Sequence, residues 1–236
     1  MKNRKKWVRV TVWALLIASI LLAAVGRYTK EYYSGLPYER PDVPVEETED
    51  YYIVGDADSA CGFIFYPGGK VEETAYLPLL APLAEADILC VAVKMPLHLA
   101  VMDADAAAAV MEDFPEVSRW YLGGHSLGGA MAAGFAAENE ERLNGLVLLA
   151  AYPTKEIKEL PVLSVYGSED GVLNRGKYEK SILLAARLTE HVIEGGNHAQ
   201  FGNYGAQEGD GAAEIDKEEQ WQETVDFILN FMRETE

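Results

Sequence analysis

Strand-length apolar runs alternate with helical patterns from residue 51 onward, and this alternation constrains the fold more than any other feature. The expected strands are Tyr51 to Val54, Gly62 to Tyr66, Ile88 to Val93, Arg119 to Leu122, Gly145 to Ala150, Val162 to Tyr166 and His191 to Ile193. The expected helices are Glu73 to Glu85, Asp103 to Asp113, Ser126 to Asn139, Lys177 to Leu188 and Asp216 to Met232. Such alternation predicts an α/β fold with a mainly parallel sheet covered by helices on both faces. A functional site would lie at the carboxyl ends of the strands.

The size of the chain fits one globular domain. Its 236 residues are 49% hydrophobic and 25% charged, which is enough for a sizeable core. We expect this domain at residues 51–236. Residues 27–50 contain Pro37, Pro41 and Pro44 and end in the acidic run Glu46 to Asp50, a composition typical of an extended tether.

The first 26 residues have the pattern of a membrane-targeting segment. Five basic residues precede an uncharged run from Val10 to Gly26; they are Lys2, Arg4, Lys5, Lys6 and Arg9. A run of this length reaches the lower limit for a membrane-spanning helix, roughly 17 residues, and exceeds the apolar region of a signal peptide, about 7 to 15. We expect a single-pass transmembrane anchor in the cell membrane, with the remaining chain extracytoplasmic. The alternatives are a cleaved signal peptide and a secreted protein, or a buried helix.

Charge narrows the choice of partners. Outside the first 26 residues, 15 Lys and Arg stand against 38 Asp and Glu, a net charge of −23. Such a body repels nucleic acid and anionic lipid surfaces, so we expect no nucleic-acid partner. Cys61 and Cys90 both lie in apolar runs, which favours two buried free thiols over a disulfide.

The segment "GGHSLGG", residues 123–129, carries the clearest chemical signal. It follows the apolar run Arg119 to Leu122 and opens an alanine-rich helical pattern. A sharp strand-to-helix turn with the pattern Gly-x-Ser-x-Gly presents its serine, here Ser126, above the sheet as a nucleophile. The alternative is a glycine-rich turn whose serine only caps the helix. The combination of strand, turn and helix favours the nucleophile.

A serine nucleophile needs a base, and four histidines are candidates. His125 adjoins the serine in a poor geometry for proton transfer, and His191 lies within an expected strand as a packed residue. His98 follows a strand and lines the same edge of the sheet. His198 stands in the loop "GGNH" after the last strand, from which a base reaches Ser126. We therefore assign His198 as the base; a surface histidine is the alternative.

The base needs an anion that fixes its tautomer and stabilises its protonated form. Asp170 follows the expected strand Val162 to Tyr166, and Glu169 competes with it. Either one has the alternative role of an acidic turn residue beside Gly171. The order Ser126, Asp170, His198 is that of the serine, acid and histidine in one known triad arrangement.

With these residues the chain resembles the α/β-hydrolase superfamily. The resemblance covers roughly residues 51 to 236 and rests on "FIFYPGGKVEETAYLPL", "YLGGHSLGGAMAAGFA", "VYGSEDGVL" and "IEGGNHAQFGNYG". It is greatest to compact, lidless bacterial proteins near the dienelactone-hydrolase-like enzymes. It implies an oxyanion hole formed by the amides of Gly69, with Lys70 as the alternative, and of Leu127. Tyr66-Pro67 replaces the His-Gly of many relatives, which leaves the first donor open.

The resemblance implies a serine hydrolase that cleaves small carboxylic esters or thioesters through a Ser-His-Asp triad and an acyl-enzyme. Only Tyr152 to Leu160 separate two expected strands where lidded relatives carry a cap domain, so we expect an open site. Two alternatives remain, an acyltransferase with the same triad and a non-catalytic tethered binding module. No histidine or cysteine cluster has metal-ligand spacing and no phosphate-binding motif is present, so we expect no cofactor and no metal. A monomer is favoured.

Overall fold

The computed structural model describes residues 11–20, 26–27, 31–39 and 42–235, and it divides into two units, Met1–Tyr32 and Tyr33–Glu236. Within the described part of the second unit, eight strands form one sheet in the order β1-β2-β4-β3-β5-β6-β7-β8. The strands are β1 (Val45–Glu47), β2 (Tyr51–Val54), β3 (Cys61–Tyr66), β4 (Ile88–Val93), β5 (Arg119–His125), β6 (Gly145–Leu149), β7 (Ile157–Gly167) and β8 (Ala185–Ile193). Strands β1 and β2 are antiparallel to their neighbours, and the other pairs are parallel.

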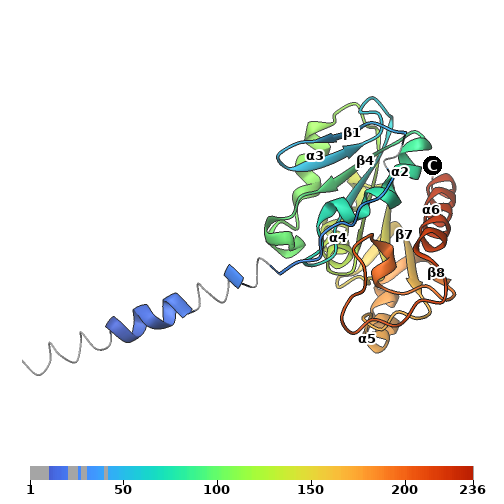
Figure 1. The fold of residues 1–236 in the computed structure, drawn as a ribbon. Helices are drawn as coiled ribbons and strands as arrows, with labels where there is room; N and C mark the ends of the chain where they lie inside the picture. The colour runs from blue at the N-terminus through green and yellow to red at the C-terminus, as the bar shows by residue number, and fades with distance from the viewer. Residues whose placement is uncertain (1–10, 21–25, 28–30, 40–41, 236) are drawn as a thin grey trace, which may run out of the picture. The chain divides into compact units, whose positions relative to one another are not determined.

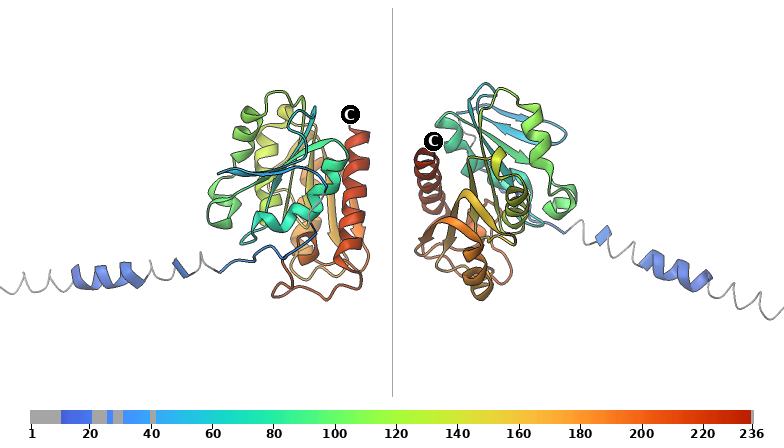
Figure 2. Two further views of the ribbon diagram at one scale, coloured as in Figure 1. Left: turned by 45° about the horizontal axis from the view of Figure 1, so that its top comes forward. Right: turned by 180° about the vertical axis from the view of Figure 1, so that it is seen from behind.

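Helices cover both faces of this sheet (Figures 1 and 2). They are α2 (Leu77–Glu85), α3 (Ala106–Asp113), α4 (Leu127–Glu138), α5 (Arg175–Ser181) and α6 (Lys217–Glu234). Short 3-10 turns occur at Glu73–Tyr76, Pro96–His98, Ala100–Met102, Glu140–Arg142, Ile182–Leu184 and Ala199–Phe201. The α/β fold with a mainly parallel, doubly covered sheet is therefore confirmed.

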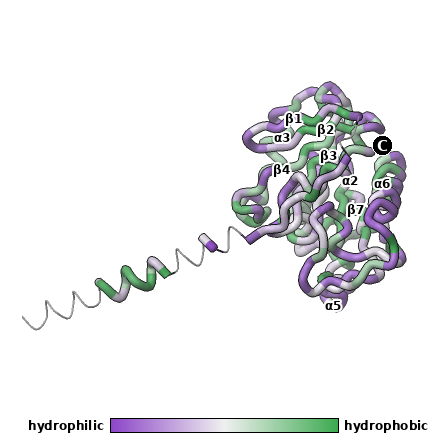
Figure 3. The backbone as a smooth tube through the Cα atoms, viewed as in Figure 1, coloured by the Kyte–Doolittle hydropathy of each residue, from purple (hydrophilic) through white to green (hydrophobic). Residues whose placement is uncertain are grey.

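Two apolar cores lie on the two faces, because successive side chains of a strand point to opposite sides. Phe63 and Phe65 of β3 belong to the core with α2 and α6, whereas Ile64 and Tyr66 belong to the core with α3 and α4. All residues of β3 and β4 are buried. Figure 3 shows these central strands as hydrophobic and the loops around them as largely hydrophilic.

Helix α6 illustrates how the sequence sets an element. The Asp216 carboxylate accepts the Glu219 N–H at 2.8 Å and caps the first turn. Val225, Ile228 and Met232 lie along one face and are buried, as the helical spacing of the apolar residues predicts.

Several boundaries differ from expectation, because β3, β5 and β7 extend beyond the expected strands and β8 begins at Ala185 rather than His191. The expected helix Lys177 to Leu188 is shorter than expected. Helix α5 ends at Ser181, and strand β8 already begins at Ala185. Here pairing with β7, from Ile157↔Ala185 onward, overrides the local pattern. Strand β1 was not expected, because its residues are all exposed and lack an apolar face.

The segment expected to be an extended tether is docked on the domain. We call residues 33–36, the first four residues of the second unit, the strap. Tyr33 pairs with Val71 in an isolated parallel bridge, and Leu36 N–H donates to Asn203 C=O. Tyr33, Tyr38 and Val43 pack against the core. Prolines and acidic residues predicted an extended tether, but these apolar side chains pack on the core and fix the segment.

The segment expected to be a membrane anchor is described only in part. Residues 11–20 are helical and hydrophobic (Figure 3), and residues 21–25 lie outside the described residues. Among the helices that the structure describes, none has both the length and the apolar character needed to span a bilayer.

Cys61 and Cys90, both within the described chain, are buried and form no disulfide, as expected.

Candidate active site

Ser126 lies at the carboxyl end of β5, immediately before α4. Its backbone has φ 52° and ψ −119°, a conformation that costs a non-glycine residue of order 1–3 kcal/mol. The turn is held on both sides, because Ser126 N–H donates to Leu149 C=O at 2.9 Å and Ala130 N–H donates to Ser126 C=O at 3.0 Å. Ser126 makes no side-chain cap bond to α4. The hydroxyl is therefore left to the cleft rather than used in capping.

Two glycines allow this sharp turn. A Cβ on Gly128 would lie 2.2 Å from the carbonyl oxygens of Tyr66 and Pro67, and one on Gly124 would lie 2.7 Å from Tyr66 O. Real Cβ atoms do not approach that closely, so α4 reaches the end of β3 only because both positions lack a side chain. This contact brings the turn beside the loop that follows β3.

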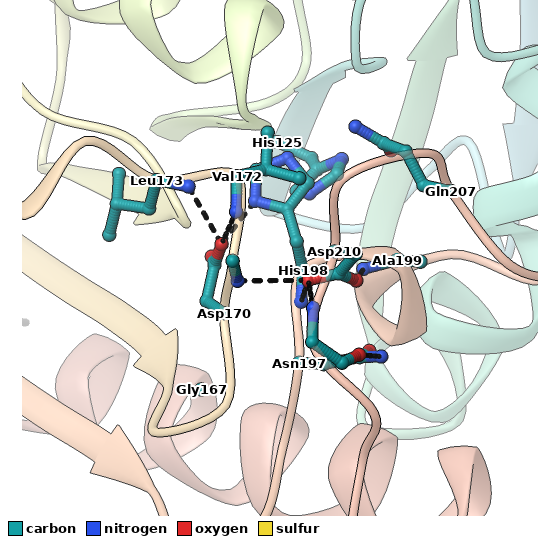
Figure 4. Close-up of polar contacts among 12 residues, drawn as sticks. His125, Gly167, Asp170, Val172, Leu173, Asn197, His198, Ala199, Gln207 and Asp210 are labelled. Carbon is teal, nitrogen blue, oxygen red and sulfur yellow. Dashed lines mark hydrogen bonds and ion pairs between the residues drawn. The ribbon is translucent and has the colours of Figure 1, made fainter.

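The predicted acid and base meet at the same edge of the sheet (Figure 4). His198 Nδ1 lies 2.8 Å from Asp170 Oδ2, and both side chains are almost completely buried. Asp170 Oδ1 accepts the N–H groups of Val172 and Leu173 at 2.9 and 2.7 Å. These bonds orient the carboxylate, and the carboxylate in turn orients the imidazole ring. His198 Nε2 is buried without a hydrogen-bond partner among the described residues, so it is available to a serine hydroxyl.

A second carboxylate, Asp210, organises the same region and was missed by the sequence analysis. It accepts backbone N–H groups from both the acid-bearing and base-bearing loops: Gly171 at 3.1 Å, His198 at 3.2 Å and Ala199 at 2.8 Å. Figure 4 shows it beside the His198 backbone. Nothing in the sequence distinguishes Asp210 from other loop aspartates, because its partners come from two distant segments.

The competing residues lie elsewhere. The Glu169 carboxylate accepts the Ser168 hydroxyl at 3.0 Å, next to it in the chain, rather than contacting the base. His191 stacks on Phe227 with ring centroids 4.0 Å apart, which fits a packed residue. His98 Nδ1 lies 3.6 Å from Glu73 Oε2, and burial raises the pKa of that carboxyl group.

His125 is buried beneath the base. Its ring centroid lies 4.5 Å from that of His198, and its Nδ1 lies 2.8 Å from the Tyr76 hydroxyl. Tyr76 Oη also accepts Gly68 N–H at 3.0 Å, so this hydroxyl links the Gly68 backbone to the His125 ring. Among the described residues, His125 Nε2 is buried and has no hydrogen-bond partner. Burial, followed by the nearby His198, holds the pKa of His125 well below its usual value.

The two predicted oxyanion-hole segments lie side by side. A Cβ on Gly69 would be 2.9 Å from Leu127 Cδ2. Leu127 is the first residue of α4, so its N–H has no intrahelical acceptor. Gly69 N–H has no acceptor among the described residues. Lys70 N–H, the alternative donor, is already bonded to His98 C=O at 2.7 Å, so of the two predicted donors only Gly69 has an N–H without an acceptor among the described residues.

Ser126 and His198 line one open cleft of about 320 Å³. Its other walls are mainly apolar: Leu127, Ala130, Ala150, Ala151, Tyr152, Thr154, Val172, Leu173 and Asn174. Only residues 150–156 connect β6 to β7, so no cap domain is inserted there. The described residues contain no group of three or more His, Cys, Asp or Glu side chains that would hold a metal ion.

Comparisons with known proteins bear on the fold and the family of this chain. None of the curated proteins matches the chain. A CIB-like hydrolase from Thermoplasma acidophilum is similar over 80% of this chain and 99% of its own, with 16% identity and a TM-score of 0.61. An α/β-hydrolase enzyme from the sediment metagenome of the Mar Chica lagoon, Morocco, covers 81% and 98%, with 13% identity and a TM-score of 0.62. Est1E from Butyrivibrio proteoclasticus covers 81% and 99%, with 13% identity and a TM-score of 0.57.

At these identities the structural likenesses show the fold alone. The model of the alpha/beta hydrolase family matches residues 62–222, which is well over half of the sequence and includes Gly69, Ser126, Asp170 and His198. The chain therefore belongs to the alpha/beta hydrolase family.

Proposed function

We propose that this protein is a serine hydrolase that cleaves carboxylic esters or thioesters, with Ser126 as nucleophile, His198 as base and Asp170 as acid. One observation carries the proposal. Ser126, held at a positive φ, shares a cleft with His198, whose other ring nitrogen lies 2.8 Å from the buried Asp170 carboxylate. Family membership supports hydrolysis as the reaction class.

The reaction follows the usual two half-reactions of this chemistry. His198 Nε2 removes the hydroxyl proton as Ser126 Oγ bonds to the carbonyl carbon, and the carbonyl π electrons move to oxygen. The amides of Gly69 and Leu127 stabilise that oxyanion. Collapse breaks the C–O or C–S bond, and His198 protonates the leaving group. Water, activated by His198, then releases the acid from Ser126.

The cleft favours uncharged substrates. Its lining, as far as the structure describes it, contains no Asp, Glu, Lys or Arg side chain. A charged acyl group would therefore lose its hydration without gaining a partner. We expect small or slender neutral acyl esters to react fastest.

Covalent labelling tests the proposal directly. A fluorophosphonate probe is expected to attach to Ser126 of the folded protein, and Ser126→Ala is expected to abolish the adduct. Turnover of an activated ester such as 4-nitrophenyl acetate, with release of acetate, shows hydrolysis. A folded protein that neither binds the probe at Ser126 nor turns over the ester would contradict the proposal and favour a binding module. Product bound to an added alcohol rather than to water would indicate acyl transfer.

We further propose that residues 1–26 anchor the protein in the cell membrane with its catalytic domain outside the cytoplasm. The basic cluster followed by the uncharged run Val10 to Gly26 supports this. Fractionation of cells that express the full chain should recover it with membranes, resistant to salt and extracted by detergent. A mature protein in the medium that begins near Arg27 would show cleavage instead.

A further inference from the structure

Among the described residues, the strap (33–36) bonds to two loops of the predicted machinery, through Lys70, Glu72 and Asn203, and its Tyr33 Oη accepts Glu208 N–H at 3.4 Å. We propose that the strap is a positioning segment, which fixes the loop of the oxyanion donor and the loop of the base in their working arrangement. The inference rests on the proposed function. We call residues 67–72 the oxyanion loop and residues 195–203 the base loop.

In the oxyanion loop, the strap bonds to the two residues on either side of Val71. Tyr33 N–H donates to Lys70 C=O at 2.7 Å, and Glu72 N–H donates to Tyr33 C=O at 2.9 Å. Val71 N–H in turn donates to Gly68 C=O at 3.1 Å. The Gly68 carbonyl and the Gly69 N–H belong to one planar trans peptide, in which they point in opposite directions. Holding the carbonyl toward Val71 therefore aims the Gly69 N–H away from it.

A charged group strengthens this side. Gly35 N–H donates to Glu72 Oε2 at 3.0 Å, a bond to a carboxylate that is half-buried. Bonds of this kind are roughly twice as strong as neutral ones. Gly35 also has little room, because a Cβ there would lie 2.5 Å from Thr74 Oγ1 and 3.0 Å from Ala75 N. A side chain at position 35 is thus incompatible with the docked strap.

On the base side, the strap binds Asn203 twice. Leu36 N–H donates to Asn203 C=O at 2.7 Å, and Asn203 Nδ2 donates to Leu36 C=O at 2.9 Å. Asn203 is buried and is the last residue of the base loop. Within this loop, a 3-10 turn begins directly after His198. The Tyr33 ring also lies 5.4 Å from that of Tyr204. The strap therefore joins the ends of two loops that come from distant parts of the sequence.

Gly35→Val in the full-length protein tests the proposal, with Gly134→Val as its matched control. Gly134 lies in α4, and a Cβ there meets nothing within 4 Å. Hydrogen exchange at the amides of Tyr33, Leu36 and Glu72 reports release of the strap. We expect Gly35→Val to speed this exchange and lower kcat by about 10- to 100-fold, since a misplacement of about 1 Å costs on the order of 100-fold. KM should change little, because no strap residue lines the cleft.

A second pair separates release of the strap from general damage. Glu72→Ala removes the acceptor of Gly35 N–H, whereas Glu72→Gln keeps an accepting oxygen. We expect kcat to fall in the first and to recover largely in the second, with thermal midpoints within a few degrees of each other. Across the two glycine variants and the two Glu72 variants, a lower kcat should accompany weaker protection of the Leu36 amide from hydrogen exchange.

Two outcomes overturn the inference. One is a released strap with unchanged kcat; the other is a lowered kcat while the strap amides stay protected. Failure of the proposed function looks different, because wild-type protein would then show neither probe labelling at Ser126 nor ester turnover. Only an active wild type makes the variants informative about the strap, and its activity is measured first.

Discussion

The two sides of the proposed catalytic edge are held by different chemistry. The acid–base side is organised by two carboxylates, Asp170 and Asp210, which accept backbone amides and the His198 ring. Immediately around Gly68, the oxyanion loop is held by neutral groups, namely the Tyr76 hydroxyl and the neutral His125 ring. The base must gain a proton during the reaction, so nearby negative charge assists it. An oxyanion donor needs only a fixed direction, which neutral bonds supply.

The largest loss of kcat should come from substitutions of the proposed acid and base. We expect Asp170→Asn and His198→Ala each to lower kcat on an activated ester by about 10⁴-fold, a magnitude known for a lost triad carboxylate. Glu169→Gln is the control, because its carboxylate contacts Ser168 rather than the base. A comparable loss in Glu169→Gln would show that the acid has been misassigned.

A smaller effect should follow at Asp210. In Asp210→Asn one accepting oxygen becomes an NH₂ group that faces backbone donors, which costs about 1.5–3 kcal/mol of charge-assisted bonding. We expect kcat to fall about 10- to 100-fold with little change in KM, measured in steady-state kinetics. Asp216→Asn, which keeps a good helix cap at α6, should leave both constants near wild type. Equal kinetics for the two variants would mean that Asp210 does not position the base.

Tyr76→Phe tests the neutral side. Gly68 N–H and His125 Nδ1 would lose their buried partner, and each unsatisfied group costs about 1–3 kcal/mol. We expect lower stability in urea unfolding together with about 10-fold lower kcat. Tyr121→Phe also removes a buried hydroxyl, one that bonds to Met232 O and Thr235 Oγ1 at the end of α6. It should lose stability and keep kcat; a fall in kcat there would remove the distinction between the two tyrosines.

The smallest effect concerns pH. His125 has a folded-state pKa below its unfolded value of about 6.5, so the unfolded chain binds more protons below that pH. Its contribution to stability is therefore fully present above pH 6.5 and is lost as pH falls below it, by up to about 1.4 kcal/mol per pH unit. Urea unfolding between pH 7.5 and 5 should show this slope, and His125→Gln should reduce it. The same slope in both proteins would assign it to another group.

Much of the sheet was predictable because its strands are buried on both faces. The expected strands Tyr51 to Val54 and Ile88 to Val93 match β2 and β4 residue for residue. Short elements with mixed patterns were not predictable: Ala185 to Leu188 carries a helical pattern and pairs with β7 instead. Local periodicity sets the first kind of element, whereas neighbouring strands set the second.

The candidate site divides in the same way. Ser126, Asp170 and His198 each stand where a strand ends, and the structure brings the acid and base into contact and the serine into their cleft. Asp210, Tyr76 and His125 act through partners far away in sequence, so no local pattern marks them. Gly69 was preferred over Lys70 as the oxyanion donor only by resemblance, and the bond from Lys70 N–H to His98 C=O adds a structural reason for that preference.

The strap also defines how mechanical load would enter the domain. Tyr33 is the first residue of the second unit, and its two backbone bonds go to Lys70 and Glu72 rather than to any strand of the sheet. Tension applied to the chain ahead of Tyr33 would thus act on two adjacent loop bonds before it reaches β1. These bonds, followed by those of Gly35 and Leu36, come before any strand pair along the chain, so they would carry the load first. The catalytic edge is consequently the first part of this domain to respond to a pull from its N-terminal end.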